Sequence, residues 1–342
     1  MLHIGIDAHL NSSAVCILDE NGRLFKRFVH RGDLRCLVRR LDDELDQPFQ
    51  VCFEASCGGG TLCDLLTPIA RRVIVAHPGH LRLIFRSKKK NDRVDAAKLA
   101  KLLFLDEVPP VHVPGRHVRA WREMVGMRSQ AVAKRTRAKN GLRALLRSHL
   151  IRPPRGLWTG KGRQWLADLE LPTASARLRR DLLLEEVKHF DRQIHRLEEE
   201  LDRIARQHPG VTLLKTIPGI GPRTAEAFCA FVDDPQRFGT KQIGPYFGLT
   251  PSQDQSGSTN RLGHITREGP AVVRRLLTEA AWRASRLSPR VKAFFERVQR
   301  GDPDRKKIAV VATAHYLARV MLAMLQSGEV WQKEVALATK AA

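Results

Sequence analysis

The pattern of apolar and polar positions near the N-terminus predicts a mixed sheet. The runs "LHIGIDAH" and "SAVCILD" are short and rich in β-branched residues, and "ENGRLFKRFVH" carries Asn21-Gly22, a strong hairpin signal. Three antiparallel strands are therefore expected. A helix at about residues 33–46, the strand "FQVCFEAS", the helix "GGGTLCDLLTPIA" and the strand "RRVIVAHP" follow. This order predicts an α/β domain with helices packed on a mixed sheet.

From about residue 80 the apolar spacing becomes helical. The stretch "RAWREMVGMRSQAVAKRTRAKNGLRALLRSHL" predicts a helix crowded with Arg and Lys. Within residues 176–207 the apolar positions are spaced alternately by four and three, which is the seam of a coiled coil. The seam consists of Leu183, Val187, Phe190, Ile194, Leu197, Leu201 and Ile204. Its partner is either residues 119–149 of the same chain or a helix of another subunit.

A third region begins after Pro209-Gly210 and is predicted to be mainly α. It holds "VTLLKTIPGIGPRTAEAFCAFV", a polar loop, and helices to the C-terminus that include "KKIAVVATAHYLARVMLAMLQ". We therefore expect domains at 1–118, 119–208 and 209–342. No stretch is expected to reach the roughly 20 apolar residues that span a bilayer, so we expect no membrane partner and a cytoplasmic location.

The charge balance points to a polyanion as the partner. The chain has 59 Lys plus Arg against 36 Asp plus Glu, a formal net charge of +23, and 43% hydrophobic residues. Such a chain can bury real cores, so its charge is not that of a disordered tail, and nucleic acid is the expected partner. The six cysteines contain no CxxC pair, which favours buried free thiols over zinc ligands or disulfides.

Four acids stand at positions that can form one site. Asp92 and Asp95 in "KNDRVDAAKLA" share one helix face, although Asp92 as an N-cap and Asp95 as a first-turn acid would also explain them. Asp7 alternates with the apolar positions of the first strand, and Glu54 ends the fourth. If the fourth strand lies parallel to the first, all four carboxylates can meet. Such a cluster would hold two Mg²⁺ ions, hard cations suited to phosphodiester displacement.

The third region contains two further motifs. "TIPGIGPRTA" holds a GxGxxA pattern, but Pro218 breaks the preceding strand, so a phosphate-binding hairpin of helix-hairpin-helix type is expected instead of a dinucleotide site. In "PSQDQSGSTNRLGHITREG" a polar, flexible loop carries Ser256, which ordinarily would be just a loop. Ringed by cations, that serine can instead attack a phosphodiester. The candidate nucleic-acid contacts are Lys134, Arg137, Gly219, Gly221, Arg223, Arg261, His264, Arg267 and Arg274.

Taken together, these motifs give the chain a close family resemblance. "GIDAH", "FEAS" and "KNDRVDAAKLA" resemble the ribonuclease H-like (RuvC-like) fold of Holliday-junction resolvases, and the whole series resembles the DEDD transposases of the insertion-sequence family one hundred and ten. The resemblance implies a RuvC-like catalytic domain, a coiled-coil insertion and a C-terminal transposase domain. It implies that Asp7, Glu54, Asp92 and Asp95 bind Mg²⁺ or Mn²⁺, and that Ser256 forms a covalent phosphoserine link to DNA.

The same resemblance implies partners. They are the DNA of the element's ends and target, a structured non-coding bridge RNA that guides the protein, and further copies of the chain in a dimer or tetramer. The expected location is the bacterial cytoplasm, associated with the nucleoid.

Two alternatives remain beside this hypothesis. One is a Mg²⁺-dependent, structure-specific endonuclease in which the serine loop only binds DNA; the other is a non-enzymatic architectural protein in which the acids cap helices. The sequence leaves open the target site, the guide's position, the preferred metal, the number of subunits, and the choice of Ser256 over Ser258 or Ser252.

Overall fold

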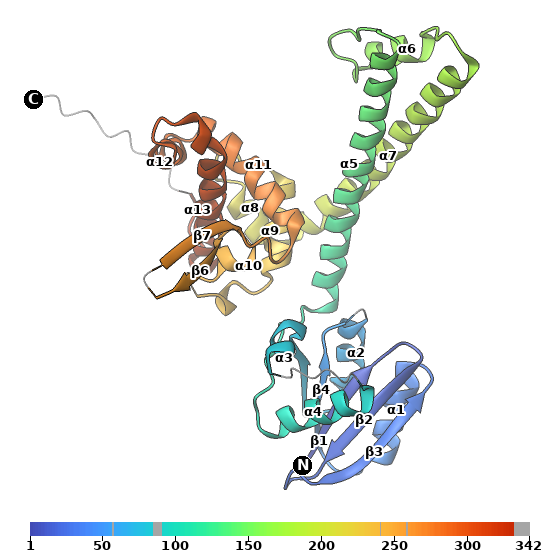
Figure 1. Cartoon of the computed structure of the whole chain (residues 1–342), viewed down its shortest axis with the longest axis vertical. Coiled ribbons are helices and arrows are strands. Elements are labelled where there is room, and N and C mark those ends of the chain that lie inside the picture. Colours follow the sequence, from blue (N-terminus) through green and yellow to red (C-terminus); the bar gives the residue numbers. More distant parts are fainter. Residues whose placement is uncertain (57, 85–90, 240, 258, 332–342) are drawn as a thin grey trace, which may run out of the picture. The chain divides into compact units, whose positions relative to one another are not determined.

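The computed structural model describes residues 1–342 except 57, 85–90, 240, 258 and 332–342, so Ser258 lies outside the described residues. The chain forms two compact units, residues 1–116 and residues 117–342, each described here by itself (Figure 1). The second unit thus includes both the predicted helical region and the predicted C-terminal region.

A five-stranded mixed sheet forms the centre of the first unit. Its strand order is β3-β2-β1-β4-β5, with β2 antiparallel to both β1 and β3, and β4 parallel to both β1 and β5. The predicted three-strand meander and the parallel addition of the fourth strand are therefore confirmed. The strands are β1 (Leu2–Ala8), β2 (Ser12–Leu18), β3 (Leu24–Arg31), β4 (Phe49–Glu54) and β5 (Arg72–Ala76).

Helices cover both faces of this sheet because the strands β1, β2 and β4 carry buried side chains on both of their sides. On one face, leucines of α1 and α2 pack on the apolar side chains of β1 and β4. On the other face, α4 packs across β1 and β2. The helices of this unit are α1 (Leu34–Glu44), α2 (Gly59–Leu66), α3 (Pro78–Ile84) and α4 (Asp92–Phe104).

Helix α4 lies unusually close to β1, since small residues meet at the contact. A Cβ atom placed on Gly5 would lie 2.2 Å from the carbonyl oxygen of Ala96 and 2.4 Å from the backbone nitrogen of Ala100. Both alanines are fully buried. Only glycine permits this approach, which brings the first turn of α4 toward the carboxyl end of β1.

Two long helices open the second unit: α5 (Arg116–Ser148) and α7 (Ala174–Gln207), joined through α6 (Gly160–Asp168). They lie side by side (Figure 1), with ion pairs that include Arg128 to Glu198 at 2.6 Å. Part of the predicted seam of α7 packs on α5 of the same chain, since Val187 is buried in one cluster with α5 residues, while the seam residues Phe190, Leu197 and Ile204 are only partly buried. The side chains that pack here include Ala138, Leu142 and Leu146 of α5 and Leu184 and Val187 of α7.

The rest of the second unit is mainly helical and shares one large core, to which Trp121, Val125 and Leu201 of the long helices also belong. This confirms the expectation of a mainly α region. The helices are α8 (Pro209–Leu214), α9 (Pro222–Val232), α10 (Ile243–Tyr246), α11 (Ala271–Leu287), α12 (Pro289–Gln299) and α13 (Lys306–Ser327), with short 3₁₀ turns at Pro235–Arg237 and Pro303–Arg305.

Helix α13 corrects one expectation from the sequence. The helical stretch Pro303–Ser327, 25 residues, is long and apolar enough by length and composition to cross a membrane. Half of it is buried within the structure, and Leu317 and Met321 lie fully buried in the core of the second unit. A core helix of this kind meets the same criteria as a membrane span, so the finding is weak evidence for one.

The prediction of a flexible loop around Ser256 is also wrong. Residues 251–265 form a two-stranded antiparallel hairpin of β6 (Pro251–Ser256) and β7 (Thr259–Ile265), in which Ser256 pairs with Thr259. All side chains of β6 are exposed, so neither strand shows the apolar alternation that normally reveals a strand in a sequence.

Candidate active site

Two predicted acids end neighbouring parallel strands at one edge of the sheet. Ile6 of β1 pairs with Phe53 of β4, so Asp7 and Glu54 follow side by side at the carboxyl ends of their strands. The side chain of Asp7 is 18% exposed, and Glu54 is exposed. The active sites of α/β folds commonly lie at such an edge.

The other two acids lie in the first turn of α4. Asn91 is the N-cap of this helix, and its side chain accepts a hydrogen bond of 3.0 Å from the backbone nitrogen of Arg93. Asp92 is therefore the first helical residue and not the cap, whereas Asp95 lies in the first turn as the alternative explanation expected. The Asp95 carboxylate accepts a hydrogen bond of 3.1 Å from Lys98.

The electrostatics of Asp7 show that the four acids lie near one another. Burial raises the pKa of Asp7, and the charges of Asp92, Asp95 and Glu54 raise it further, while His9 acts in the opposite direction. Like charges this close repel one another, and a bound cation would relieve that repulsion. The structure thus brings the four predicted acids to one place.

His9 is a member of this cluster that sequence reasoning missed. Its Nε2 lies 3.5 Å from Oδ1 of Asp7 and 3.8 Å from Oδ2 of Asp92. The donor atoms of these three residues all lie within 4.8 Å of one another. The signal was present in "DAH", because a residue two positions after Asp7 points to the same side of an extended chain.

This set of side chains fits a divalent cation. Carboxylate oxygens are the ligands that Mg²⁺ and Mn²⁺ take in proteins, and imidazole is a further ligand for transition metals. Asp7 and Asp92 offer oxygen atoms near His9, and Glu54 and Asp95 lie close enough to influence Asp7.

Ser256 lies in the second unit at the end of β6. It is exposed, and in the described part of the chain its hydroxyl has no hydrogen-bond partner. Ser252 is also exposed, and its Oγ lies against Gly263 of β7, where an added Cβ atom would come within 2.5 Å of it. Arg261 and His264 are exposed on β7. The hairpin therefore presents an exposed hydroxyl, with Arg261 two positions along β7 from Thr259, the residue that pairs with Ser256.

Among the other predicted contacts, Arg274 has a structural role. It donates hydrogen bonds to the carbonyl oxygens of Phe247 at 3.0 Å and Glu268 at 2.7 Å, and burial lowers its pKa. Arg267 is exposed. On α5, Lys134 and Arg137 are also exposed, so all three remain available to phosphates.

The glycines of the predicted hairpin serve the packing of the turn. Gly219 has a φ of +96°, and a Cβ atom there would lie 2.6 Å from the backbone nitrogen of Ala284 in α11. Gly221 is the N-cap of α9, which has no side-chain cap. The first backbone N–H groups of α9 are thus free of a side-chain acceptor, as a phosphate clamp would require.

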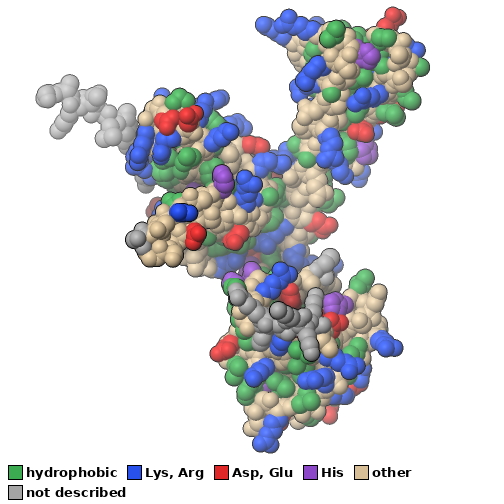
Figure 2. Space-filling model, in the orientation of Figure 1, with side chains coloured by type: hydrophobic (Ala, Val, Ile, Leu, Met, Phe, Trp, Pro, Cys, Tyr) green, Lys and Arg blue, Asp and Glu red, His purple; other side chains and the backbone are tan. Residues whose placement is uncertain are grey.

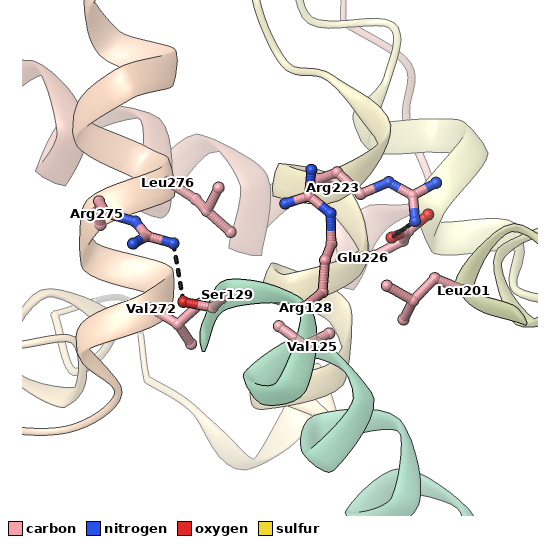
Figure 3. A pocket seen from close by; sticks show the side chains of 9 residues that line it. All are labelled: Val125, Arg128, Ser129, Leu201, Arg223, Glu226, Val272, Arg275 and Leu276. Atoms are coloured by element: carbon pink, nitrogen blue, oxygen red, sulfur yellow. Dashed lines mark hydrogen bonds and ion pairs between the residues drawn. The ribbon is translucent and has the colours of Figure 1, made fainter. Parts of the chain in front are cut away.

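Arg223 differs from its expected role. Its guanidinium binds the Asp202 carboxylate, and its Nη1 lies 3.2 Å from Oε2 of Glu226, as Figure 3 shows for the latter pair. The Arg223 side chain is 16% exposed, and Glu226 is fully buried, with no hydrogen-bond partner for either oxygen among the residues that the structure describes. Burial raises the pKa of Glu226 to about 7. Arg223 is therefore paired with two carboxylates of the same chain, and this geometry does not favour a contact between Arg223 and a phosphate.

Basic side chains are spread over the second unit. Figure 2 shows Lys and Arg side chains along the α5–α7 pair and over the helical bundle, with fewer acids between them. This distribution matches the surplus of 59 basic over 36 acidic residues and suits a polyanion.

Comparison with known proteins identifies relatives along most of the chain. A DEDD transposase family model of the IS110 type matches residues 4–151, and a model for the "Transposase IS116/IS110/IS902 family" matches residues 211–296. The chain is 27% identical to the transposase for insertion sequence element IS1111A of Coxiella burnetii, over 96% of this chain and 91% of that protein. It is 25% identical to the transposase for element IS1328 of Yersinia enterocolitica, over 96% of this chain and 98% of that protein. It is also 28% identical to the "Probable family 20 transposase" of Pseudomonas aeruginosa, over 94% and 92% of the two chains.

Proposed function

We propose that this DNA transposase belongs to the IS110-type DEDD family and that it moves its insertion sequence by cutting and rejoining DNA through Ser256. The observation that carries the proposal is the meeting of four carboxylates where β1, β4 and α4 converge. Relatives along most of the chain are transposases, which sets aside the architectural alternative.

In this proposal Asp7, Glu54, Asp92 and Asp95 hold Mg²⁺ or Mn²⁺. When bound, the metal supplies positive charge that stabilises the phosphate in its transition state and lowers the pKa of an attacking or leaving oxygen. The positions of the four acids determine where the metal charge would lie. Gly5 contributes to this, since it allows α4, which carries Asp92 and Asp95, to lie directly on β1. The sheet order and the parallel pairing of β1 with β4 support the RuvC-like fold that the resemblance implies.

The serine step transfers a phosphate from one oxygen to another. The Oγ of Ser256 forms a bond to phosphorus as the bond from phosphorus to the 3′ oxygen breaks, and the serine proton ends on the released 3′-hydroxyl. Attack of a 3′-hydroxyl on the phosphoserine reverses the step, restores the serine and joins a new strand. Because the phosphoserine conserves the bond energy, no nucleotide cofactor is needed. The exposed Arg261 and His264 of β7 are suited to stabilise the negative charge on the phosphate.

We further propose that the protein works with a structured non-coding guide RNA and as a homo-oligomer. The exposed Lys134 and Arg137 of α5 support contact with nucleic acid. Leu178 and Leu182 lie four residues apart on α7 and are 60% and 53% exposed, which supports a contact between subunits through this helical pair. In this proposal the domain of residues 1–118 contributes the four acids. The region of residues 119–208 contacts nucleic acid and other subunits, and the domain of residues 209–342 contributes the phosphate-binding hairpin and Ser256.

The test is trapping of the covalent intermediate. Full-length protein, Mg²⁺, RNA transcribed from the flanking non-coding segments and labelled DNA from the element's ends are incubated, denatured and separated. We expect label on the protein that maps to Ser256, disappears in Ser256→Ala and in Asp7→Asn, and persists in the matched control Ser252→Ala.

A structure-specific endonuclease is the second candidate, because the acid cluster is complete within residues 1–116. It predicts nicked DNA without a protein adduct, equally strong in Ser256→Ala. That result would overturn the serine mechanism and leave the acids as the catalytic centre.

A further inference from the structure

We propose that His9 is a direct ligand of the catalytic metal through its Nε2, together with Asp7 and Asp92, and that this nitrogen makes the site prefer Mn²⁺ to Mg²⁺. The inference rests on the proposed function only in requiring that the acids bind a metal. It adds a residue and a metal preference to the four-carboxylate site.

The distances already suit a shared ion. Two ligand atoms bound to one cation at about 2.0–2.2 Å lie at most about 4.4 Å apart. Nε2 of His9 lies 3.5 Å from Oδ1 of Asp7 and 3.8 Å from Oδ2 of Asp92, both inside that limit. The ligand atoms of all three residues lie within 4.8 Å of one another, so small side-chain rotations would bring the three within reach of one ion.

The backbone around His9 holds the ring in this position. The backbone nitrogen of His9 donates to the carbonyl oxygen of Ser12 at 3.2 Å, which closes the turn between β1 and β2. The hydroxyl of Ser13 donates to the carbonyl oxygen of His9 at 3.5 Å. The side chain remains 52% exposed, which leaves room for water or a DNA phosphate on the open side of an ion.

Nitrogen changes the metal preference for a chemical reason. Mg²⁺ takes oxygen ligands almost exclusively, whereas imidazole is a good ligand for first-row transition metals. A site made only of Asp7, Glu54, Asp92 and Asp95 would suit both ions. Replacing one oxygen ligand by the His9 nitrogen disfavours Mg²⁺ and leaves Mn²⁺ as the better occupant.

A different role for His9 makes different predictions. If the ring only forms an ion pair with the Asp7 carboxylate, the metal has oxygen ligands alone, and substitution of His9 changes affinity for both ions in parallel. A direct bond would place a nitrogen nucleus in contact with the metal. These two roles are separable by spectroscopy.

The first experiment is electron spin echo measurement of Mn²⁺ bound to the full-length protein without DNA. We expect a coupling to ¹⁴N typical of a directly bound imidazole, its loss in His9→Ala, and its retention in the control His195→Ala on α7, whose side chain is also exposed. Bound Mn²⁺ with no nitrogen coupling, or a coupling that survives in His9→Ala, would overturn the proposal.

The second experiment compares the affinities for Mn²⁺ and Mg²⁺ by titration calorimetry. We expect the protein to bind Mn²⁺ at least about tenfold more tightly than Mg²⁺, and His9→Asp, which restores an oxygen ligand, to remove most of that difference. An unchanged ratio of affinities in His9→Asp would contradict the inference. Neither readout needs DNA cleavage, so a failure of the serine mechanism would leave both results interpretable.

Discussion

Glu226 is a buried acid whose unfavourable burial cannot be predicted from its position in the sequence. It lies in the middle of α9, fully buried; within the described part of the chain neither oxygen has a hydrogen-bond partner, and Arg223 lies 3.2 Å from it (Figure 3). A buried carboxyl in this position is more favourable when neutral, which explains why burial raises its pKa to about 7.

This shift predicts a pH dependence of stability. Folding raises the pKa of Glu226 from its ordinary value of 4.5 to about 7, so the stabilisation is fully present below about pH 4.5 and is lost as the pH rises through 7. We expect Glu226→Gln, which stays neutral, to be more stable than the wild type at pH 8 by an amount on the order of 3 kcal/mol at most, and to show no gain at pH 4. Urea unfolding of both proteins at several pH values measures this. A difference that is constant with pH would contradict it.

At the scale of elements, the contact of α4 with β1 decides where the acids lie. This contact depends on Gly5, because any side chain there would meet the backbone of Ala96 and Ala100. Asp92 and Asp95 belong to the same helix as these alanines, while Asp7 follows Gly5 in the same strand. Moving α4 away from β1 would therefore separate the acids.

Gly5→Ala is accordingly expected to impair both stability and metal binding. The added methyl group would lie 2.2 Å from a backbone oxygen, so α4 must shift, with a loss of at least about 2 kcal/mol of unfolding free energy and weaker Mn²⁺ binding. Denaturant unfolding and Mn²⁺ titration provide the readouts.

Gly126→Ala in α5 is the matched control. Its added methyl group would meet no atom within 4 Å, and alanine favours a helix over glycine by about 1 kcal/mol. We expect this variant to be as stable as the wild type or more so, with unchanged Mn²⁺ binding. Equal effects of the two substitutions would mean that the close approach of α4 is not the cause.

For the molecule as a whole, the excess of positive charge governs affinity for nucleic acid. With a formal net charge of +23, binding should weaken steeply with salt, because each phosphate contact releases counterions. Exposed residues such as Lys134 and Arg137 contribute to this effect, whereas Arg223 is already neutralised by Asp202 and Glu226.

The double variant Lys134→Ala/Arg137→Ala is thus expected to lower the slope of log affinity against log salt by about 2, and to weaken binding alike for all sequences. Arg223→Ala should leave the slope unchanged and instead lower thermal stability, since it leaves a buried carboxyl alone. Fluorescence anisotropy with labelled DNA and RNA over a salt series tests both. A reduced slope in Arg223→Ala would show that this arginine reaches phosphates after all.

Much of the fold followed from local patterns. The alternation in β1 and β2, the Asn21-Gly22 turn and the helical spacing of α4 and α7 each report which side of an element is apolar, and that information is local. The positions of the four acids at element ends followed from the same patterns. The β6–β7 hairpin did not, because its exposed polar residues carry no such alternation.

By itself, the sequence determined the order and type of most elements, the excess of positive charge, and the positions of Asp7 and Glu54 at the ends of their strands. Only the tertiary structure decided which element covers each apolar side and which charges meet. It paired part of the seam of α7 with α5, placed His9 beside Asp7 and Asp92, and enclosed Arg223 between Asp202 and Glu226. The physical reason is that periodicity records the direction in which a side chain points, whereas ion pairs and packing depend on residues brought together from distant parts of the chain.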